Sequence, residues 1–471
     1  MLRTQLSIKN TNVDRHLSQS WMARRLGSTV SDAPAMKVAI VGSGPAGCYT
    51  AKYLVQSVSK VNKSEGNGPG GVHIDILEKL PTPFGLVRSG VAPDHPEVKN
   101  VQNDFSDMFD KYSSQDGTTD NIDDRKARAS VSFFGNVHVG EDISLQELRE
   151  MYDVVVLAYG CQSDRKLGIP GEDTLSGVLC AREFVSWYNG HPDFVHIGEI
   201  VRRALGDDPS QASVVVVGQG NVALDCARIL AKGRDGLDET DISSHTLDAI
   251  GPGVQKTTVV GRRGHVQAAF TIKELRELVN LKKDGHDTDF RISQQELDLG
   301  TTEASQEELS GKGSRPKIRL DKVLREAAKV TTAANDDDAC NKSVEVRFLL
   351  NPVRFEPPNH QDRDEPIDGN RLGAVVCERT RLEGEPFRQS AVGTGTFETF
   401  RADLVRTLRI RLDHHWATVR IHLEGCLWCF LYPQGLIQSL IYRLAIIRTG
   451  TRQYRIQGLA PPGHGGERLV R

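Results

Sequence analysis

Two glycine-rich turns, each placed directly after an apolar run, constrain this chain most. The first, GSGPAG at residues 42–47, follows the run 37–41, and the second, GQGNVA at residues 218–223, follows the run 214–217. Each pattern predicts a buried parallel strand that turns into a helix. The first glycine permits the tight turn, the second lets a pyrophosphate approach the backbone, and the third small residue lets the helix pack on the strand. The helix N-terminus then offers unpaired N–H groups to phosphates.

The residue that ends the next strand discriminates between cofactors. After the first turn, the predicted strand 72–77 ends in Glu78. A carboxylate there accepts hydrogen bonds from ribose hydroxyls and repels a 2′-phosphate, so FAD or NAD fits and NADP does not. Glu78 lies 31 residues beyond Gly47, more than the usual spacing of about 20. The loop-like segment 64–71 accounts for the excess.

The strand after the second turn ends in residues of the opposite charge. The next predicted strand, 257–261, ends in Arg262 and Arg263. Two guanidinium groups suit a 2′-phosphate, which they can hold through charge-assisted, bidentate bonds. The second site is therefore expected to take NADP(H). Because the two motifs share the strand–turn–helix context, the predicted fold class is α/β with two Rossmann-like dinucleotide-binding domains.

Composition adds limits on partners and location. The chain has 471 residues, room for two or three domains, and its net charge of −3 argues against a nucleic-acid partner. Residues 1–30 contain five basic residues, four serines and one acid, a composition typical of a mitochondrial transit peptide. A disordered N-terminal extension is the alternative. Neither a metal site nor a transmembrane helix is expected.

The domain boundaries follow from the strand 153–158, which ends in Tyr159 and Gly160. Such a strand is a point where the chain can pass between two nucleotide-binding units. We expect residues 281–315 to be irregular and a helix over 321–330. The expected domains are a transit peptide over 1–35, the N-terminal part of the FAD-binding domain over 36–160, the NADP-binding domain over 161–380, a return towards the FAD domain over 381–405 and an atypical tail over 406–471.

Longer motifs make the pattern specific. They are PFGLVR at 83–88, GVAPDHPEVKN at 90–100, GQGNVALD at 218–225, VGRRG at 260–264 and FTIKELRE at 270–277. Over residues 36–405 this set resembles the mitochondrial adrenodoxin reductase family, which are ferredoxin–NADP⁺ reductases of the glutathione-reductase-like type. The resemblance implies a flavoprotein that takes a hydride from NADPH onto FAD and passes single electrons to a [2Fe–2S] ferredoxin.

The resemblance also implies roles for single residues. His95 and Asp225 would lie near the flavin and pair with each other, and Glu274 would be a further NADP contact. Arg315, Lys317 and Arg319 would face an acidic ferredoxin that binds transiently. Taken without the resemblance, this basic run is an ordinary solvated surface and His95 is an ordinary turn residue. The expected cofactor contacts are Gly42, Gly44, Ala46, Gly47, Glu78, Leu86 and Val139 for FAD, and Gln219, Gly220, Asn221, Val222, Arg262, Arg263 and Glu274 for NADP(H).

The tail departs from the family pattern. Residues 401–471 contain eleven arginines, no lysine and four acids, a net charge of +7, whereas the first 400 residues carry −10. In the family, a C-terminal segment with a Gly-Trp pair completes the FAD domain, and here it is replaced from about residue 406. The hypothesis is a shifted reading frame, an unspliced intron or an alternative exon. The pair Cys426 and Cys429 has redox or metal spacing, but a lone pair is more often incidental.

Three functions therefore stand against one another. The first is a monomeric mitochondrial reductase, active in the matrix or on the matrix face of the inner membrane, with at most peripheral membrane association. It would serve P450 or iron–sulfur cluster pathways. The second is a truncated, flavin-poor and poorly active isoform that only binds NADP(H) or a ferredoxin. The third is a flavin subunit that serves another acceptor, although such a subunit is expected to bring its own cysteine-rich iron–sulfur segment.

Overall fold

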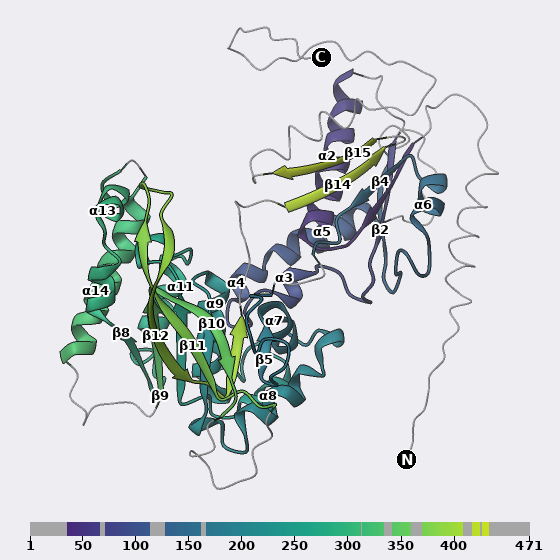
Figure 1. The fold of residues 1–471 in the computed structure, drawn as a ribbon. Coiled ribbons are helices and arrows are strands. Elements are labelled where there is room, and N and C mark those ends of the chain that lie inside the picture. Colours follow the sequence, from purple (N-terminus) through teal and green to yellow (C-terminus); the bar gives the residue numbers. More distant parts are fainter. Residues whose placement is uncertain are drawn as a thin grey trace, which may run out of the picture.

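The computed structural model is shown in Figure 1. It describes residues 35–65, 71–113, 128–161, 166–311, 313–333, 342–358, 370–407, 417–423 and 426–432. The expected transit peptide lies outside the described residues except for its last position, and so does most of the expected tail. Within the described ranges, every helix is too short or too polar to pass through a bilayer.

The first unit is built on a six-stranded sheet with the order β15-β14-β4-β1-β2-β3. β1 to β4 run parallel, whereas β14 pairs antiparallel with β4 and with β15. The helices α2 and α5 pack on this sheet (Figure 1). The bounds are β1 (Met36–Val41), α2 (Pro45–Glu65), β2 (Gly71–Leu77), α5 (Val101–Tyr112), β3 (Arg128–Phe134), α6 (Leu145–Met151), β4 (Val154–Leu157), β14 (Ala417–Leu423) and β15 (Cys426–Tyr432).

The second unit has a parallel six-stranded sheet with the order β5-β13-β6-β7-β9-β8. Its central strand β6 carries four consecutive valines that are all buried, as expected for a parallel strand covered on both faces. The bounds are β5 (Val178–Cys180), β6 (Ser213–Val217), β7 (Lys256–Gly261), β8 (Thr288–Ile292), β9 (Lys342–Phe348) and β13 (Leu404–Thr407).

Amphipathic helices cover this second sheet. In α8, Ile197, Val201 and Leu205 recur at a spacing of four and are buried, while Arg202 and Arg203 face solvent. The helix ends at Gly206, whose φ of 74° favours glycine. The helices are α7 (Ala181–Tyr188), α8 (Ile197–Leu205), α9 (Asn221–Lys232), α10 (Ser244–Ile250), α11 (Ile272–Val279), α12 (Gln294–Leu299), α13 (Glu303–Ser310) and α14 (Arg315–Ala333).

The segment expected to return towards the first unit belongs to the second one instead. β10 (Leu350–Glu356), β11 (Ala374–Glu383) and β12 (Ser390–Arg401) form an antiparallel sheet, and β13 then inserts between β5 and β6. Leu404 and Val405 are fully buried there. The boundary expected at residue 380 therefore shifts to the end of β13, because these two apolar side chains complete the second unit's core.

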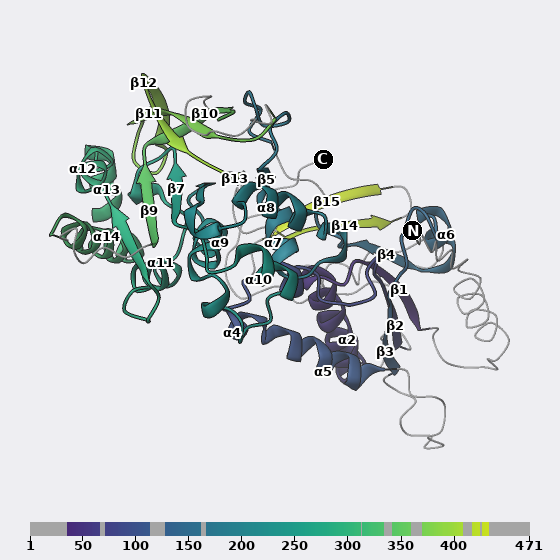
Figure 2. The same ribbon diagram turned by 90° about the horizontal axis from the view of Figure 1, so that it is seen from below.

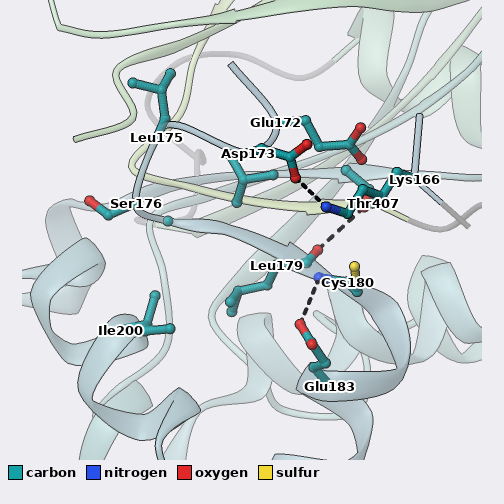
Figure 3. A pocket seen from close by; sticks show the side chains of 12 residues that line it. Lys166, Glu172, Asp173, Leu175, Ser176, Leu179, Cys180, Glu183, Ile200 and Thr407 are labelled. Atoms are coloured by element: carbon teal, nitrogen blue, oxygen red, sulfur yellow. Dashed lines mark hydrogen bonds and ion pairs between the residues drawn. The ribbon is translucent and has the colours of Figure 1, made fainter. Parts of the chain in front are cut away.

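The two ends of the second unit lie close together. Lys166, before β5, and Thr407, the last residue of β13, line one cavity of about 330 Å³ (Figure 3). Lys166 pairs with Asp173 at 2.5 Å, and the Thr407 hydroxyl donates to the Leu179 carbonyl at 3.5 Å. The second unit is thus inserted into the first through neighbouring entry and exit points.

Each unit has its own apolar core. Among the described residues, every cluster of buried apolar side chains is drawn either from residues 36–158 or from residues 167–405. Figure 2 shows the two sheets with the short helix α4 (Pro96–Lys99) between them. The contact between the units is therefore not a shared apolar core.

Candidate functional site

The first glycine-rich turn connects β1 to α2 as the pattern predicts. Gly42 has a φ of +103°, and a Cβ there would lie 2.7 Å from the Ala158 carbonyl oxygen. A Cβ on Gly47 would lie 2.0 Å from the Gly42 carbonyl oxygen, so the start of the helix packs directly against the turn. A Cβ on Gly44 would have a single neighbour within 4 Å, the Gly85 Cα at 4.0 Å. The first and third glycines are thus required by packing, whereas the second faces space that a ligand can use.

Glu78 lies at the mouth of this turn. One of its carboxylate oxygens accepts hydrogen bonds from the Ser43 backbone N–H at 2.9 Å and from the Ser43 hydroxyl at 2.6 Å. The other accepts from the Leu80 N–H at 3.1 Å. The β2 strand therefore delivers a fixed carboxylate next to the helix N-terminus, where a ribose would be bound.

The loop after Glu78 covers the turn. The Phe84 N–H donates to the Ser43 carbonyl at 3.0 Å, and Gly85, with a φ of +48°, comes so close that its Cβ would lie 2.8 Å from the Gly44 Cα. The short helix α3 (Leu86–Ser89) follows, and Leu86 is 61 % exposed. Of the other expected FAD contacts, Ala46 packs against the sheet's core and Val139 bridges to Ile143.

The second turn leads from β6 into α9. Around Gly220, an added Cβ would meet nothing within 4 Å, so the space over the helix N-terminus is open. The Gln219 side-chain amide donates to the Arg263 carbonyl at 3.0 Å, and the Asn221 side-chain oxygen accepts from the Thr271 N–H at 2.7 Å. These two side chains hold the neighbouring loops around the turn. Val222 is half-buried beside them.

Arg262 and Arg263 follow β7 and stay exposed. Within the described part of the chain, neither forms an ion pair with a carboxylate, so both guanidinium groups can receive an anion. Neighbouring protein atoms partly desolvate the Arg263 guanidinium, and this effect, followed by the charge of Arg262, lowers the pKa of Arg263 from its ordinary value. Glu274 lies in the first turn of α11, and its Oε2 is buried without a hydrogen-bond partner. An unpaired buried acceptor favours a donor such as a ribose hydroxyl at this position.

The three basic residues expected to face a partner do not form one surface. Arg315 and Arg319 are exposed and four residues apart, on one face of α14. Lys317 turns inward, pairs with the buried Glu308 at 2.5 Å and lies 5.0 Å from the centre of the Phe387 ring. The structure thus separates two exposed arginines from one lysine that contacts its own unit.

His95 and Asp225 come together, but not as the expected direct pair. His95 Nε2 lies 2.6 Å from Glu277 Oε2, and Asp225 pairs with Arg228 at 2.9 Å. Burial raises the pKa of Asp225. Arg228 and Glu277 were not expected from the sequence, because each is an ordinary charged residue on an amphipathic helix.

Comparison with known proteins shows which family the chain is similar to. Residues 36–324 match the model of the pyridine nucleotide-disulphide oxidoreductase family. The chain is 42 % identical over 395 residues to the mitochondrial NADPH:adrenodoxin oxidoreductase of Arabidopsis thaliana, covering 83 % of this chain and 71 % of that protein. To the human protein of the same name it is 38 % identical, covering 78 % of this chain and 65 % of the relative.

A bacterial protein has a similar sequence identity. The NADPH-ferredoxin reductase FprA of Mycobacterium tuberculosis is 39 % identical over 372 residues, which cover 78 % of this chain and 69 % of FprA. The structure of that enzyme in complex with NADPH superimposes with a TM-score of 0.63 over 80 % of this chain and 70 % of FprA. The chain therefore spans about two thirds of the length of these relatives.

Proposed function

The chain belongs to the family of NADPH:adrenodoxin oxidoreductases and NADPH-ferredoxin reductases, and from this premise we propose that it is an NADPH-dependent flavoprotein reductase. The cofactors of the family are FAD and NADP(H). In the proposed reaction a hydride passes from NADPH to the flavin, and single electrons then leave for an iron–sulfur ferredoxin.

One contrast carries the proposal. The first turn has a carboxylate, Glu78, fixed on the Ser43 N–H, and the second has two exposed guanidinium groups, Arg262 and Arg263. FAD has an unphosphorylated adenosine ribose and suits the first arrangement. NADP(H) carries a 2′-phosphate and suits the second. Both turns also leave the pyrophosphate side of their second glycine open.

The protein's own part is to hold and orient the two cofactors. Gly44, Ala46, Glu78, Leu86 and Val139 would hold FAD. The second turn, Arg262, Arg263 and the unpaired Oε2 of Glu274 would hold NADP(H). When bound, FAD would supply the hydride and single-electron chemistry. This chemistry requires no nucleophile from the chain. Among the described residues, no group of three or more potential metal ligands occurs.

The partner is proposed to be a [2Fe–2S] ferredoxin that docks on the exposed arginines of α14, Arg315 and Arg319. Exposed charges favour fast, transient encounter rather than tight binding. The mitochondrial location is also a proposal. The basic, serine-containing residues 1–30 and the mitochondrial relatives support it, although the bacterial relative is equally similar.

Substitution of Arg262 and Arg263 by glutamine tests the cofactor assignment. Each charge-assisted bond contributes about 1.5–3 kcal/mol, so KM for NADPH should rise at least about tenfold, while KM for NADH should change little. The matched control is the substitution by glutamine of Arg202 and Arg203, two consecutive exposed arginines of α8. Equal effects on NADPH and NADH would contradict the assignment.

The visible spectrum of the purified chain separates the reductase from its alternatives. Flavin bands that bleach with NADPH support the reductase. A colourless protein that still binds NADP⁺ would support the poorly active isoform. Bleaching by NADPH without electron transfer to any [2Fe–2S] ferredoxin would support a flavin subunit with another acceptor.

A further inference from the structure

Among the described residues, one short segment of the first unit makes most of the ion pairs to the second unit. Residues 94–99 contain four charged or titratable side chains, and each pairs across the interface. Asp94 contacts Arg228 and Lys232, His95 contacts Glu277, Glu97 contacts Lys273, and Lys99 contacts Asp241. Because no buried apolar cluster in the described ranges includes residues of both units, these charges are the main specific contacts that can fix the orientation of the units.

Arg228 is at the centre of this network. Its side chain is 1 % exposed, and its Nε and Nη2 donate to the two carboxylate oxygens of Asp94 at 2.7 and 2.8 Å. Further carboxylates approach from its own unit, Asp225 at 2.9 Å and Glu277 at 3.4 Å. A bidentate arginine–carboxylate pair fixes both distance and angle, which the single bond of a lysine does not.

Both partners connect rigidly to the nucleotide-binding turns. Arg228 lies on α9, seven residues after Asn221, or about 10 Å along the helix axis from the second turn. Asp94 follows the loop that covers the first turn. That loop is fixed by hydrogen bonds from Phe84 to Ser43 and from Val91 to Leu86, at 3.0 and 3.1 Å. The Asp94–Arg228 bond therefore spans from one turn to the other through ordered backbone.

We propose that Arg228 is a positioning residue that, through Asp94, sets the separation and angle of the two nucleotide-binding units and thereby the hydride-transfer geometry. The catalytic consequence of this inference rests on the proposed function, whereas the orientation of the units is independent of it. Arg228 itself lies too far along α9 to contact the pyrophosphate at the helix N-terminus, so its effect is on transfer rather than on binding.

The orientation can be measured without any nucleotide. Spin labels on unnatural amino acids at Glu141 of the first unit and Arg203 of the second, both more than 70 % exposed, report the distance between units by pulsed electron paramagnetic resonance. Arg228→Gln and Asp94→Asn should broaden or shift the distance distribution. Asp193→Asn is the matched control, because it removes the exposed interunit pair with Lys79. Unchanged distributions in Arg228→Gln and Asp94→Asn would overturn the proposal.

The kinetic consequence separates positioning from binding. In stopped-flow reduction by NADPH, the rate of flavin bleaching should fall at least tenfold in Arg228→Gln and Asp94→Asn, and the kinetic isotope effect with 4-deuterated NADPH should rise. The Kd for NADP⁺ should stay within threefold. Arg228→Lys, which keeps the charge and folds more readily, should give an intermediate rate. The double variant Asp94→Asn/Arg228→Gln should be no slower than either single one.

The outcomes distinguish the two levels of inference. A wild-type chain that NADPH does not reduce would contradict the proposed function, and the label distances would still decide the role of Arg228. Normal reduction rates in all three single variants, or a Kd that rises in parallel with the loss of rate, would overturn the positioning role.

Discussion

At the scale of single residues, the two turns use glycine for different reasons. Gly42 requires a positive φ, and a Cβ there would collide with the backbone of Ala158 and Tyr159, just after β4, whereas Gly220 has open space and a φ of −115°. Gly42→Ala should therefore destabilise the first unit by at least about 2 kcal/mol, from backbone strain and overpacking. Gly220→Ala should keep its melting temperature and lose affinity for NADP⁺. Calorimetric melting and titration with NADP⁺ measure the two effects. A Gly220→Ala variant that binds NADP⁺ normally would show that the pyrophosphate lies elsewhere.

Glu78 permits a second prediction at this scale. Its carboxylate accepts three hydrogen bonds from the first turn and from Leu80, and it would also accept from the ribose of FAD. Glu78→Gln removes the charge and one acceptor oxygen. We expect FAD affinity to fall about tenfold, in line with the loss of a charge-assisted bond of about 1.5 kcal/mol. The ratio of flavin to protein absorbance after dialysis measures this loss. Glu141→Gln, at an exposed glutamate of the same unit, should retain the flavin.

At the scale of elements, the parts of the fold that have a local sequence signal can be predicted. β1, α2, β6 and α9 follow from an apolar run, a glycine turn and a helix pattern that are contiguous in the chain. Residues 281–315 are predicted to be irregular, but they contain β8, α12 and α13. In α13, the buried Glu308 accepts hydrogen bonds from Phe387 and Gln389, about 80 residues away. A sequence window cannot show that a polar helix is stabilised by such distant partners.

The same limit applies to the candidate site. Glu78, Arg262 and Arg263 could be found because they end strands next to glycine turns. Arg228 and Glu277 could not, because their partners Asp94 and His95 lie more than 130 residues earlier in the chain. The boundary at residue 380 was wrong for a similar reason. Only the tertiary structure shows that β13 fills the gap between β5 and β6.

Helix α14 provides a prediction about the partner surface. Arg315→Glu/Arg319→Glu should raise KM for a [2Fe–2S] ferredoxin several-fold at low salt and less at 0.5 M salt, because exposed charges are screened. Lys317→Gln should leave this KM nearly unchanged. It should instead lower the melting temperature, since the buried Glu308 loses its cation. Ferredoxin-dependent cytochrome c reduction at two salt concentrations tests this. An equal rise in KM for Lys317→Gln would place all three residues on the docking surface.

At the scale of the whole molecule, the charged interface predicts a pH dependence. Burial alone would raise the pKa of Asp94, but the hydrogen bonds and charges of Arg228 and Lys232 outweigh burial and lower it. A carboxyl group whose pKa is lowered in the folded state stabilises the fold at pH values above its unfolded pKa of about 3.9. This contribution to stability is lost as the pH falls from the unfolded pKa through the folded pKa. The stability advantage over Asp94→Asn should therefore be full at pH 7 and shrink below about pH 4. Melting temperatures of both proteins from pH 7 to pH 3 test this sign. A gap between the two proteins that stayed constant over this range would contradict it.

Separate cores also predict that the inserted unit can exist alone. Residues 161–407 contain all six strands of the second sheet and its apolar clusters, and the ends of the segment, near Lys166 and Thr407, line one cavity. Excision exposes the Arg228 surface, which is charged and so tolerates water. We expect the excised unit to melt cooperatively and to bind 2′,5′-ADP more tightly than 5′-ADP, with the preference abolished by Arg262→Gln/Arg263→Gln. Circular dichroism melting and calorimetric titration measure both properties. If the excised unit is unfolded, the prediction is wrong. The first unit would then stabilise the second by more than ion pairs, because the loss of surface ion pairs leaves an apolar core complete.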